Sequence, residues 1–157
     1  MSTKAIQSQR VEPIANYSRN RDGLRNYLFD LADELFPFPG FRDYQDEILH
    51  GALEALFIEG HTNVVIDGPT GIGKSPVNVT LGRVFKHLAK NKRRLEDHFN
   101  YKLYGIESGK SFYTTPQKQL RNQLAEDVDL QEYVTMLKSR QDYICGASGD
   151  NCKDCTL

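Results

Sequence analysis

The chain has 157 residues and a formal net charge of −1, with hydrophobic residues at 39% and charged residues at 26%. This length and composition are typical of a globular domain with its own core, and they exclude a collagen, a coiled coil and a wholly disordered chain. No apolar run is long enough for a transmembrane helix, and the first residues lack the apolar region of a secretory signal. We therefore expect a cytoplasmic protein with no membrane partner.

The first third of the chain predicts an arm and two helices. Residues 1–20 are polar and lack periodicity, which is typical of a flexible N-terminal arm. Leucines at helical spacing predict a helix over residues 22–35, with Asp22 as its cap and a proline-rich stop after it. A second apolar face predicts a helix over residues 43–59, which Asp43 caps and Gly60 ends.

The middle of the chain alternates apolar β-branched and helical patterns. Val64–Ile66 predicts a short buried strand, and a helix through Val77 and Leu88 follows the glycine-rich turn after it. Residues 90–110 have no clean period and predict a surface insertion or long loop. Ser111–Thr114 predicts a second strand, and helices follow from Pro116 and over residues 132–140. This order predicts an α/β fold with parallel strands and flanking helices.

Charge is unevenly distributed along the chain. Residues 83–110 carry eight basic and three acidic side chains, whereas residues 1–82 carry seven basic and eleven acidic ones. Together with Phe99, Tyr101 and Tyr104, the basic segment is compatible with binding of single-stranded nucleic acid. A solvated insertion explains the same composition, and we favour that interpretation.

The most specific motif is a glycine-rich loop between the first predicted strand and the next helix. It fits the pattern GxxxxGK[ST] at every fixed position, and it predicts a site for ATP and Mg²⁺. Glycines allow close approach of a phosphate, whose oxygens accept bonds from the loop amides and the helix N-terminus. Lys74 then contacts the β- and γ-phosphates, and the Ser75 hydroxyl binds the metal. The predicted phosphate-binding residues are Gly68, Pro69, Thr70, Gly71, Ile72, Gly73, Lys74 and Ser75.

Together with two further segments, this loop resembles the iron–sulfur branch of the superfamily 2 DNA helicases, typified by DinG and XPD. The segment FPFPGFRDYQ, residues 36–45, is similar to the adenine-binding element of that family, which implies that Gln45, and more weakly Arg42, contacts adenine. The segment YTTPQKQLRNQL, residues 113–124, is similar to a family motif that contacts the DNA backbone. The resemblance therefore implies DNA contacts by Thr114, Thr115, Gln117 and Arg121.

All three cysteines lie in the last 13 residues, as Cys145, Cys152 and Cys155. Clustered thiols in a chain without a secretory signal indicate a metal site before disulfides, and either zinc or an iron–sulfur cluster normally needs four ligands. The preceding LKSRQDYIC, residues 137–145, resembles the helicase segment that supplies the first ligand of a [4Fe–4S] cluster. The resemblance implies a fourth cysteine that is absent from this sequence.

We therefore expect the N-terminal portion of an ATP-dependent DNA helicase. Residues 1–20 are the arm, 21–144 the first part of a RecA-like motor domain, and 145–157 the start of the cluster segment. The expected partners are single-stranded or forked DNA and the remainder of the motor. Because the sequence lacks the Asp-Glu pair that follows the cysteines in the family, we expect weak nucleotide binding and no useful turnover by this chain alone. A non-catalytic nucleotide- or DNA-binding module, and another phosphate-loop NTPase with a zinc-binding tail, remain alternatives.

Overall fold

The computed structural model describes residues 4–5, 13–69, 71–114, 118–127, 130, 132–135, 137 and 144. Contacts within the chain divide it into two units, residues 1–116 and 117–157, which are described separately. In the first unit the elements are β1 (Lys4–Ala5), the 3₁₀ turn η1 (Ile14–Asn16), α1 (Arg21–Glu34), β2 (Gly40–Phe41), α2 (Gln45–Leu53), the π-helical turn η2 (Glu54–Ile58) and α3 (Lys74–Phe99). In the second unit, α4 spans Lys118–Glu126.

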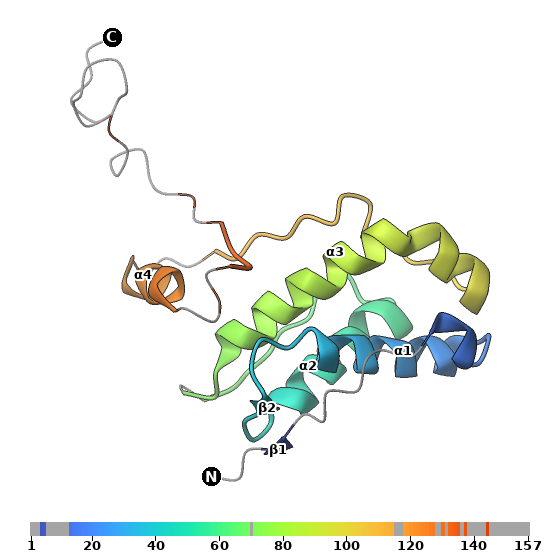
Figure 1. Ribbon diagram of the computed structural model, residues 1–157, viewed down its shortest axis with the longest axis horizontal. Helices are drawn as coiled ribbons and strands as arrows, with labels where there is room; N and C mark the ends of the chain where they lie inside the picture. The colour runs from blue at the N-terminus through green and yellow to red at the C-terminus, as the bar shows by residue number, and fades with distance from the viewer. Residues whose placement is uncertain are drawn as a thin grey trace. The chain divides into compact units, whose positions relative to one another are not determined.

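The core of the first unit lies between three helices that all contact one another (Figure 1). Each helix has apolar side chains at helical spacing, so that one stripe faces the other two helices. The side chains with 2% exposure or less include Leu24, Leu28 and Leu31 of α1, Leu49 and Leu53 of α2, and Val84, Leu88, Leu95 and Phe99 of α3. These helices therefore form a packed layer that supports the loop before α3.

The first two helices predicted from apolar periodicity are present, with different ends. Asn20 rather than Asp22 caps α1, because its side chain accepts a hydrogen bond from the Gly23 amide at 2.8 Å. The second helix begins at Gln45 and continues as η2, and Gly60 follows with a φ of 81°. A glycine in this left-handed conformation is a common helix stop, as the sequence predicts.

The predicted α/β fold with parallel strands is wrong for the residues that the structure describes. Their only strands are the two-residue β1 and β2, which pair antiparallel with Lys4 opposite Phe41. Neither Val64–Ile66 nor Ser111–Thr114 forms a strand. A strand needs a neighbour that completes its hydrogen bonds, and β-branched composition alone does not provide one. Val65, in the strand that was predicted to be buried, is 93% exposed, and Phe112, in the second predicted strand, is 78% exposed.

The prediction of a long loop over residues 90–110 is wrong in its first half, because α3 continues to Phe99. Leu88, Leu95 and Phe99 keep the helical spacing and are buried, but the charged side chains between them obscure the pattern in the sequence. Pro116 lies outside the described residues, and α4 follows it with Leu124 buried. Residues 132–135 form no helix, and most of the remaining predicted helix to residue 140 is outside the described residues.

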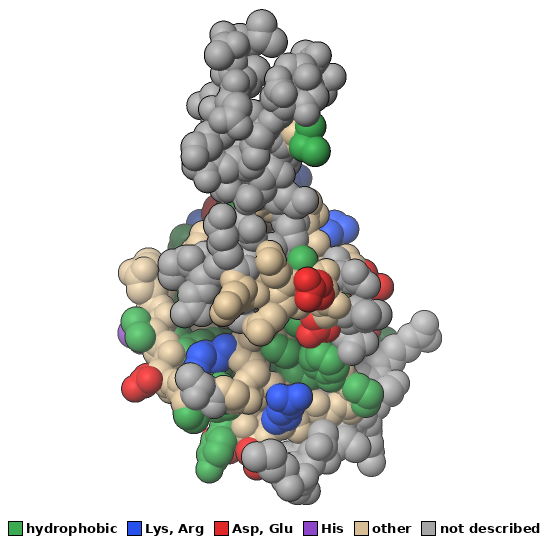
Figure 2. Space-filling view, turned by 90° about the vertical axis from the view of Figure 1, so that its left-hand side faces the viewer, with side chains coloured by type: hydrophobic (Ala, Val, Ile, Leu, Met, Phe, Trp, Pro, Cys, Tyr) green, Lys and Arg blue, Asp and Glu red, His purple; other side chains and the backbone are tan. Residues whose placement is uncertain are grey.

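The surface of the molecule also presents large apolar side chains. Figure 2 shows hydrophobic and basic side chains reaching the surface on one face. Among the described residues of the first unit, the most exposed large hydrophobic side chains are those of Val65, Phe112, Tyr104 and Tyr44. Each of them lies in a turn or extended segment and not in a helix, so the helices themselves bury most of their apolar faces.

Candidate functional site

The glycine-rich loop leads directly into the N-terminus of α3. Gly71 and Gly73 have φ values of 89° and 80°, which are left-handed conformations that strain most other residues. Gly73 is the N-cap of α3, so the helix begins at Lys74 as the motif predicts. Thr70 lies outside the described residues. No backbone amide of Gly71–Lys74 donates a hydrogen bond to a described residue.

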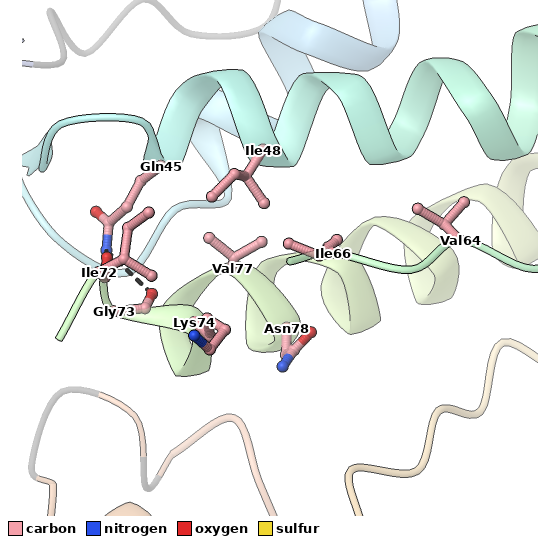
Figure 3. A pocket seen from close by; sticks show the side chains of 9 residues that line it. All are labelled: Gln45, Ile48, Val64, Ile66, Ile72, Gly73, Lys74, Val77 and Asn78. Atoms are coloured by element: carbon pink, nitrogen blue, oxygen red, sulfur yellow. Dashed lines mark hydrogen bonds between the residues drawn. The ribbon is translucent and has the colours of Figure 1, made fainter. Parts of the chain in front are cut away.

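Gln45 holds this loop against the start of α2. Its amide nitrogen donates hydrogen bonds to the carbonyl oxygens of Ile72 and Gly73, both at 3.0 Å. Its Oε1 accepts a hydrogen bond from the Arg42 amide at 2.8 Å, and only 2% of the residue is exposed. Figure 3 shows the side chain reaching across to the loop. Both donor hydrogens are therefore used by the protein's own backbone, whereas the helicase resemblance implies that Gln45 contacts adenine.

The backbone just before Gln45 forms a tight turn. Tyr44 has a φ of 68°, an unusual conformation for a residue with a side chain. The backbone nitrogen of Gln45 donates a hydrogen bond to the Arg42 carbonyl oxygen at 3.1 Å. The Arg42 and Gln45 residues thus bond to each other in both directions across a tight turn. The Arg42 side chain itself is exposed.

The loop approaches Gln45 so closely that a side chain on Gly73 would have to displace the end of the Gln45 side chain. A Cβ atom built on Gly73 would lie 2.3 Å from Nε2, the side-chain amide nitrogen of Gln45. A Cβ atom built on Gly71 would meet nothing within 4 Å. The two motif glycines therefore differ: Gly71 is required by its conformation alone, and Gly73 by conformation and by contact.

Lys74 folds back over the loop that precedes it. Its ammonium group donates to the carbonyl oxygens of Gly68 and Pro69, at 2.6 and 3.0 Å. The side chain is exposed, so an anion in solution has access to the ammonium. Ser75 follows as the second residue of α3 and is partly buried. Pro76 lies in the first turn of the helix, where its missing amide hydrogen costs no helical hydrogen bond.

A pocket of about 240 Å³ opens beside the loop. Its apolar lining includes Ile48 of α2, Val64 and Ile66 of the segment before the loop, and Val77 of α3 (Figure 3). Its polar lining is formed by Gln45, Lys74 and Asn78. Its lining consists of Gln45, Ile48, Val64, Ile66, Ile72, Gly73, Lys74, Val77 and Asn78. Sequence reasoning missed Ile48 and Asn78 as lining residues. Ile48 is part of an ordinary amphipathic pattern, and Asn78 lies one helical turn after Lys74, which is the only signal that could have identified it.

The residues predicted to contact DNA are only partly described. Thr114 is exposed at the end of its extended segment, and Arg121 lies on α4. Thr115 and Gln117, and the side chain of Arg121, lie outside the described residues. The predicted metal ligands Cys145, Cys152 and Cys155 also lie outside them. Across the residues that the structure does describe, no group of three or more potential metal ligands is present.

No protein-family model, curated protein or solved structure matches the chain. The resemblance to iron–sulfur helicases therefore stays a prediction that depends on the sequence motifs. In the described part of the chain, no helix has the length and apolar character needed to cross a membrane.

Proposed function

We propose that the loop of residues 68–75 binds the phosphates of ATP together with Mg²⁺, and that the chain forms the N-terminal portion of an ATP-dependent DNA helicase. The observation that carries the proposal is the loop itself, which has the full phosphate-binding sequence and ends at the N-terminus of the 26-residue α3. The positive end of a long helix favours an anion at this position. The buried Gln45 supports the proposal, because its side chain holds the loop backbone through hydrogen bonds to the carbonyl oxygens of Ile72 and Gly73.

Phosphate binding at this loop requires an exchange of partners by Lys74. Without an anion its ammonium is satisfied by two carbonyl oxygens of its own loop. A triphosphate offers charged acceptors, which make stronger hydrogen bonds than neutral carbonyls do. We expect Lys74 to move to the phosphates while the backbone amides of Gly71–Lys74 donate to the same oxygens. Ser75 is placed within the first turn of α3, where its hydroxyl would bind the Mg²⁺ that accompanies the phosphates.

The helicase part of the proposal depends on the sequence. The segments around Gln45, Thr114 and Cys145 resemble three separate elements of the iron–sulfur branch. Under this proposal the chain contacts single-stranded or forked DNA, and it works with the remainder of a helicase motor. Turnover also needs a metal-binding carboxylate and charge-stabilising groups acting together. We therefore propose binding of nucleotide by this chain.

The three cysteines are proposed as ligands of a [4Fe–4S] cluster, which needs a fourth ligand in addition to them. Anaerobic purification followed by absorbance spectroscopy and metal analysis tests this assignment. A brown, iron-loaded protein that loses its colour when Cys152 is changed to Ser supports the cluster. A colourless protein that holds zinc contradicts it and favours the alternative of a phosphate-loop protein with a zinc-binding tail.

Nucleotide binding is tested by titration of the chain with a fluorescent ATP analogue and Mg²⁺. Lys74→Ala removes a charge-assisted contact, so we expect affinity to fall about 10- to 100-fold. Lys102→Ala is the matched control, because Lys102 is an exposed lysine outside the loop. Ser75→Ala should weaken binding with Mg²⁺ and have little effect in its absence. Equal affinity of the Lys74→Ala variant and the parent chain would refute the phosphate site.

A further inference from the structure

The long helix α3 carries a row of cations on the side away from the core. Lys86, Lys90 and Arg93 are spaced by four and three residues, so they lie on one face of the helix. The core residues Val84, Leu88 and Leu95 point to the opposite side. All three cations are exposed, and they make no hydrogen bond or ion pair to a described residue. We call Lys86, Lys90 and Arg93 the basic row.

The acidic residues of the same region are mostly engaged elsewhere. Glu107 pairs with Lys92 at 3.2 Å, and Glu96 accepts a hydrogen bond from the Leu103 amide at 2.8 Å. Of the three acidic side chains in residues 83–110, only Asp97 is exposed with no interaction to a described residue. Apart from the Lys92–Glu107 pair, no ion pair between described residues neutralises the cations of residues 86–110, so much of the positive charge of this segment reaches the surface.

The segment after α3 doubles back along the helix (Figure 1). Leu103 is bonded to Glu96, Lys92 pairs with Glu107, and a Cβ atom on Gly109 would lie 2.8 Å from Ala89. Further back, the Ser111 hydroxyl lies beside Gly82. The return segment therefore follows α3 over 14 residues, from position 96 to position 82, which is about 21 Å of helix.

Exposed aromatic rings mark both ends of this return segment. Tyr104 directly follows Leu103 and is 76% exposed, and Phe112 directly follows Ser111 and is 78% exposed. Of the neighbouring aromatic residues, Phe99 is buried, the Tyr101 hydroxyl donates to the Ile58 carbonyl at 3.2 Å, and Tyr113 is 40% exposed. Both exposed rings therefore belong to the segment that returns along α3, the helix that carries the basic row.

We propose that the basic row, with Tyr104 and Phe112 beside it, is a binding surface for single-stranded nucleic acid. The cations contact the phosphates, and the two rings stack on unpaired bases, which is how proteins bind single strands without sequence preference. The surface lies on α3 and its return segment, and it includes none of the residues that the sequence predicts to contact DNA. This inference rests on the proposed function, because that function supplies the expectation of a DNA partner.

The test is fluorescence anisotropy with a labelled oligo-dT strand over a range of salt concentrations. Because each phosphate contact adds close to one unit to the salt dependence of binding, Lys86→Gln/Lys90→Gln/Arg93→Gln should reduce the slope of log affinity against log salt by about two to three. We also expect at least a tenfold loss of affinity at low salt. Arg93→Gln and Arg19→Gln form a matched pair, since both arginines are exposed, and only the first should lower the slope.

The aromatic rings separate nucleic acid from other polyanions. Tyr104→Ala and Phe112→Ala should each lower the affinity for oligo-dT about 5- to 100-fold, because one stacked base is lost. Affinity for a duplex of equal length should be lower than for the single strand, since its bases are not open for stacking. Equal binding to duplex, or to vesicles with anionic lipids, together with no effect of the ring variants, would overturn the proposal.

Two further measurements keep this inference distinct from the nucleotide site. ATP-analogue affinity should be unchanged in the triple variant, and oligo-dT affinity in the absence of nucleotide should be unchanged in Lys74→Ala. Loss of nucleotide binding with intact strand binding would refute the phosphate site alone. Strand binding that is insensitive to all basic-row and ring variants would refute the surface alone.

Discussion

The helical layer and the two extended segments beside it bury similar kinds of side chain to very different degrees. Leu28 of α1 is 0% exposed, whereas Val65, in the segment before the phosphate loop, is 93% exposed. Both are aliphatic residues in apolar stretches of the sequence. The difference is that a helix completes its backbone hydrogen bonds by itself and needs only side-chain contacts, whereas a strand also needs a neighbouring strand.

The largest expected effect tests this contrast directly. Leu28→Ala removes a buried side chain and leaves a cavity between α1 and its neighbours, so the free energy of unfolding should fall by about 3 kcal/mol. Val65→Ala changes a solvated side chain and should change that free energy by less than about 0.5 kcal/mol. Urea denaturation followed by circular dichroism measures both values. Comparable losses from the two variants would show that Val65 is buried in solution and that the contrast is wrong.

A smaller effect is expected at the junction of the two regions, where Gln45 holds the loop. Gly73→Ala forces a side chain into a left-handed backbone and against the Gln45 amide, so it should cost about 2 to 3 kcal/mol of stability. Gly71→Ala meets the same backbone strain with open space around it, and about 1 kcal/mol is expected. Chemical denaturation of the two variants gives the comparison. If Gly71→Ala is the more damaging of the two, the contact with Gln45 does not restrict the loop.

The sequence predicts the helical layer better than anything else in the molecule. The leucine spacing of residues 24–35 is sufficient to place α1, because helical periodicity is a local signal. The end of α3 at Phe99 is missed, since charged residues dominate its last turns. The strand prediction at Val64–Ile66 is wrong because composition cannot say whether a partner strand is present.

The candidate site divides in the same way. The motif places Gly73 and Lys74 at the start of a helix, as the structure has them, because glycine conformations and helix starts are local properties. Gln45 lies 28 residues before Gly73 in the sequence, and its hydrogen bonds to the loop have no local signature. The resemblance implies a ligand-contacting role for Gln45, and the structure adds a contact that holds the loop. Long-range hydrogen bonds of this kind depend on how the helices pack, which no single segment encodes.

The smallest effect concerns a polar pair inside the helical layer, and it tests how well that layer excludes water. Tyr27 of α1 and His87 of α3 lie 2.9 Å apart, hydroxyl oxygen to Nε2. Burial lowers the pKa of His87, an effect that Glu34 opposes and Lys90 reinforces, and burial also raises the pKa of Tyr27. The folded state therefore binds a proton at His87 less readily than the unfolded chain does. Its contribution to stability is present above the unfolded value near 6.5 and is lost as the pH falls below it.

Stability measured by urea denaturation between about pH 7.5 and pH 5 should consequently decrease toward acid, and His87→Gln should flatten that decrease. Tyr27→Phe is the informative control, because it removes the hydroxyl while the partial burial of His87 is kept. Since burial is the main cause of the lowered pKa, the acid-side loss should persist in Tyr27→Phe. An acid-side loss that is as steep in His87→Gln as in the parent chain would mean that His87 is solvated in solution. The helical layer would then be more open at α1 and α3 than its other buried side chains indicate.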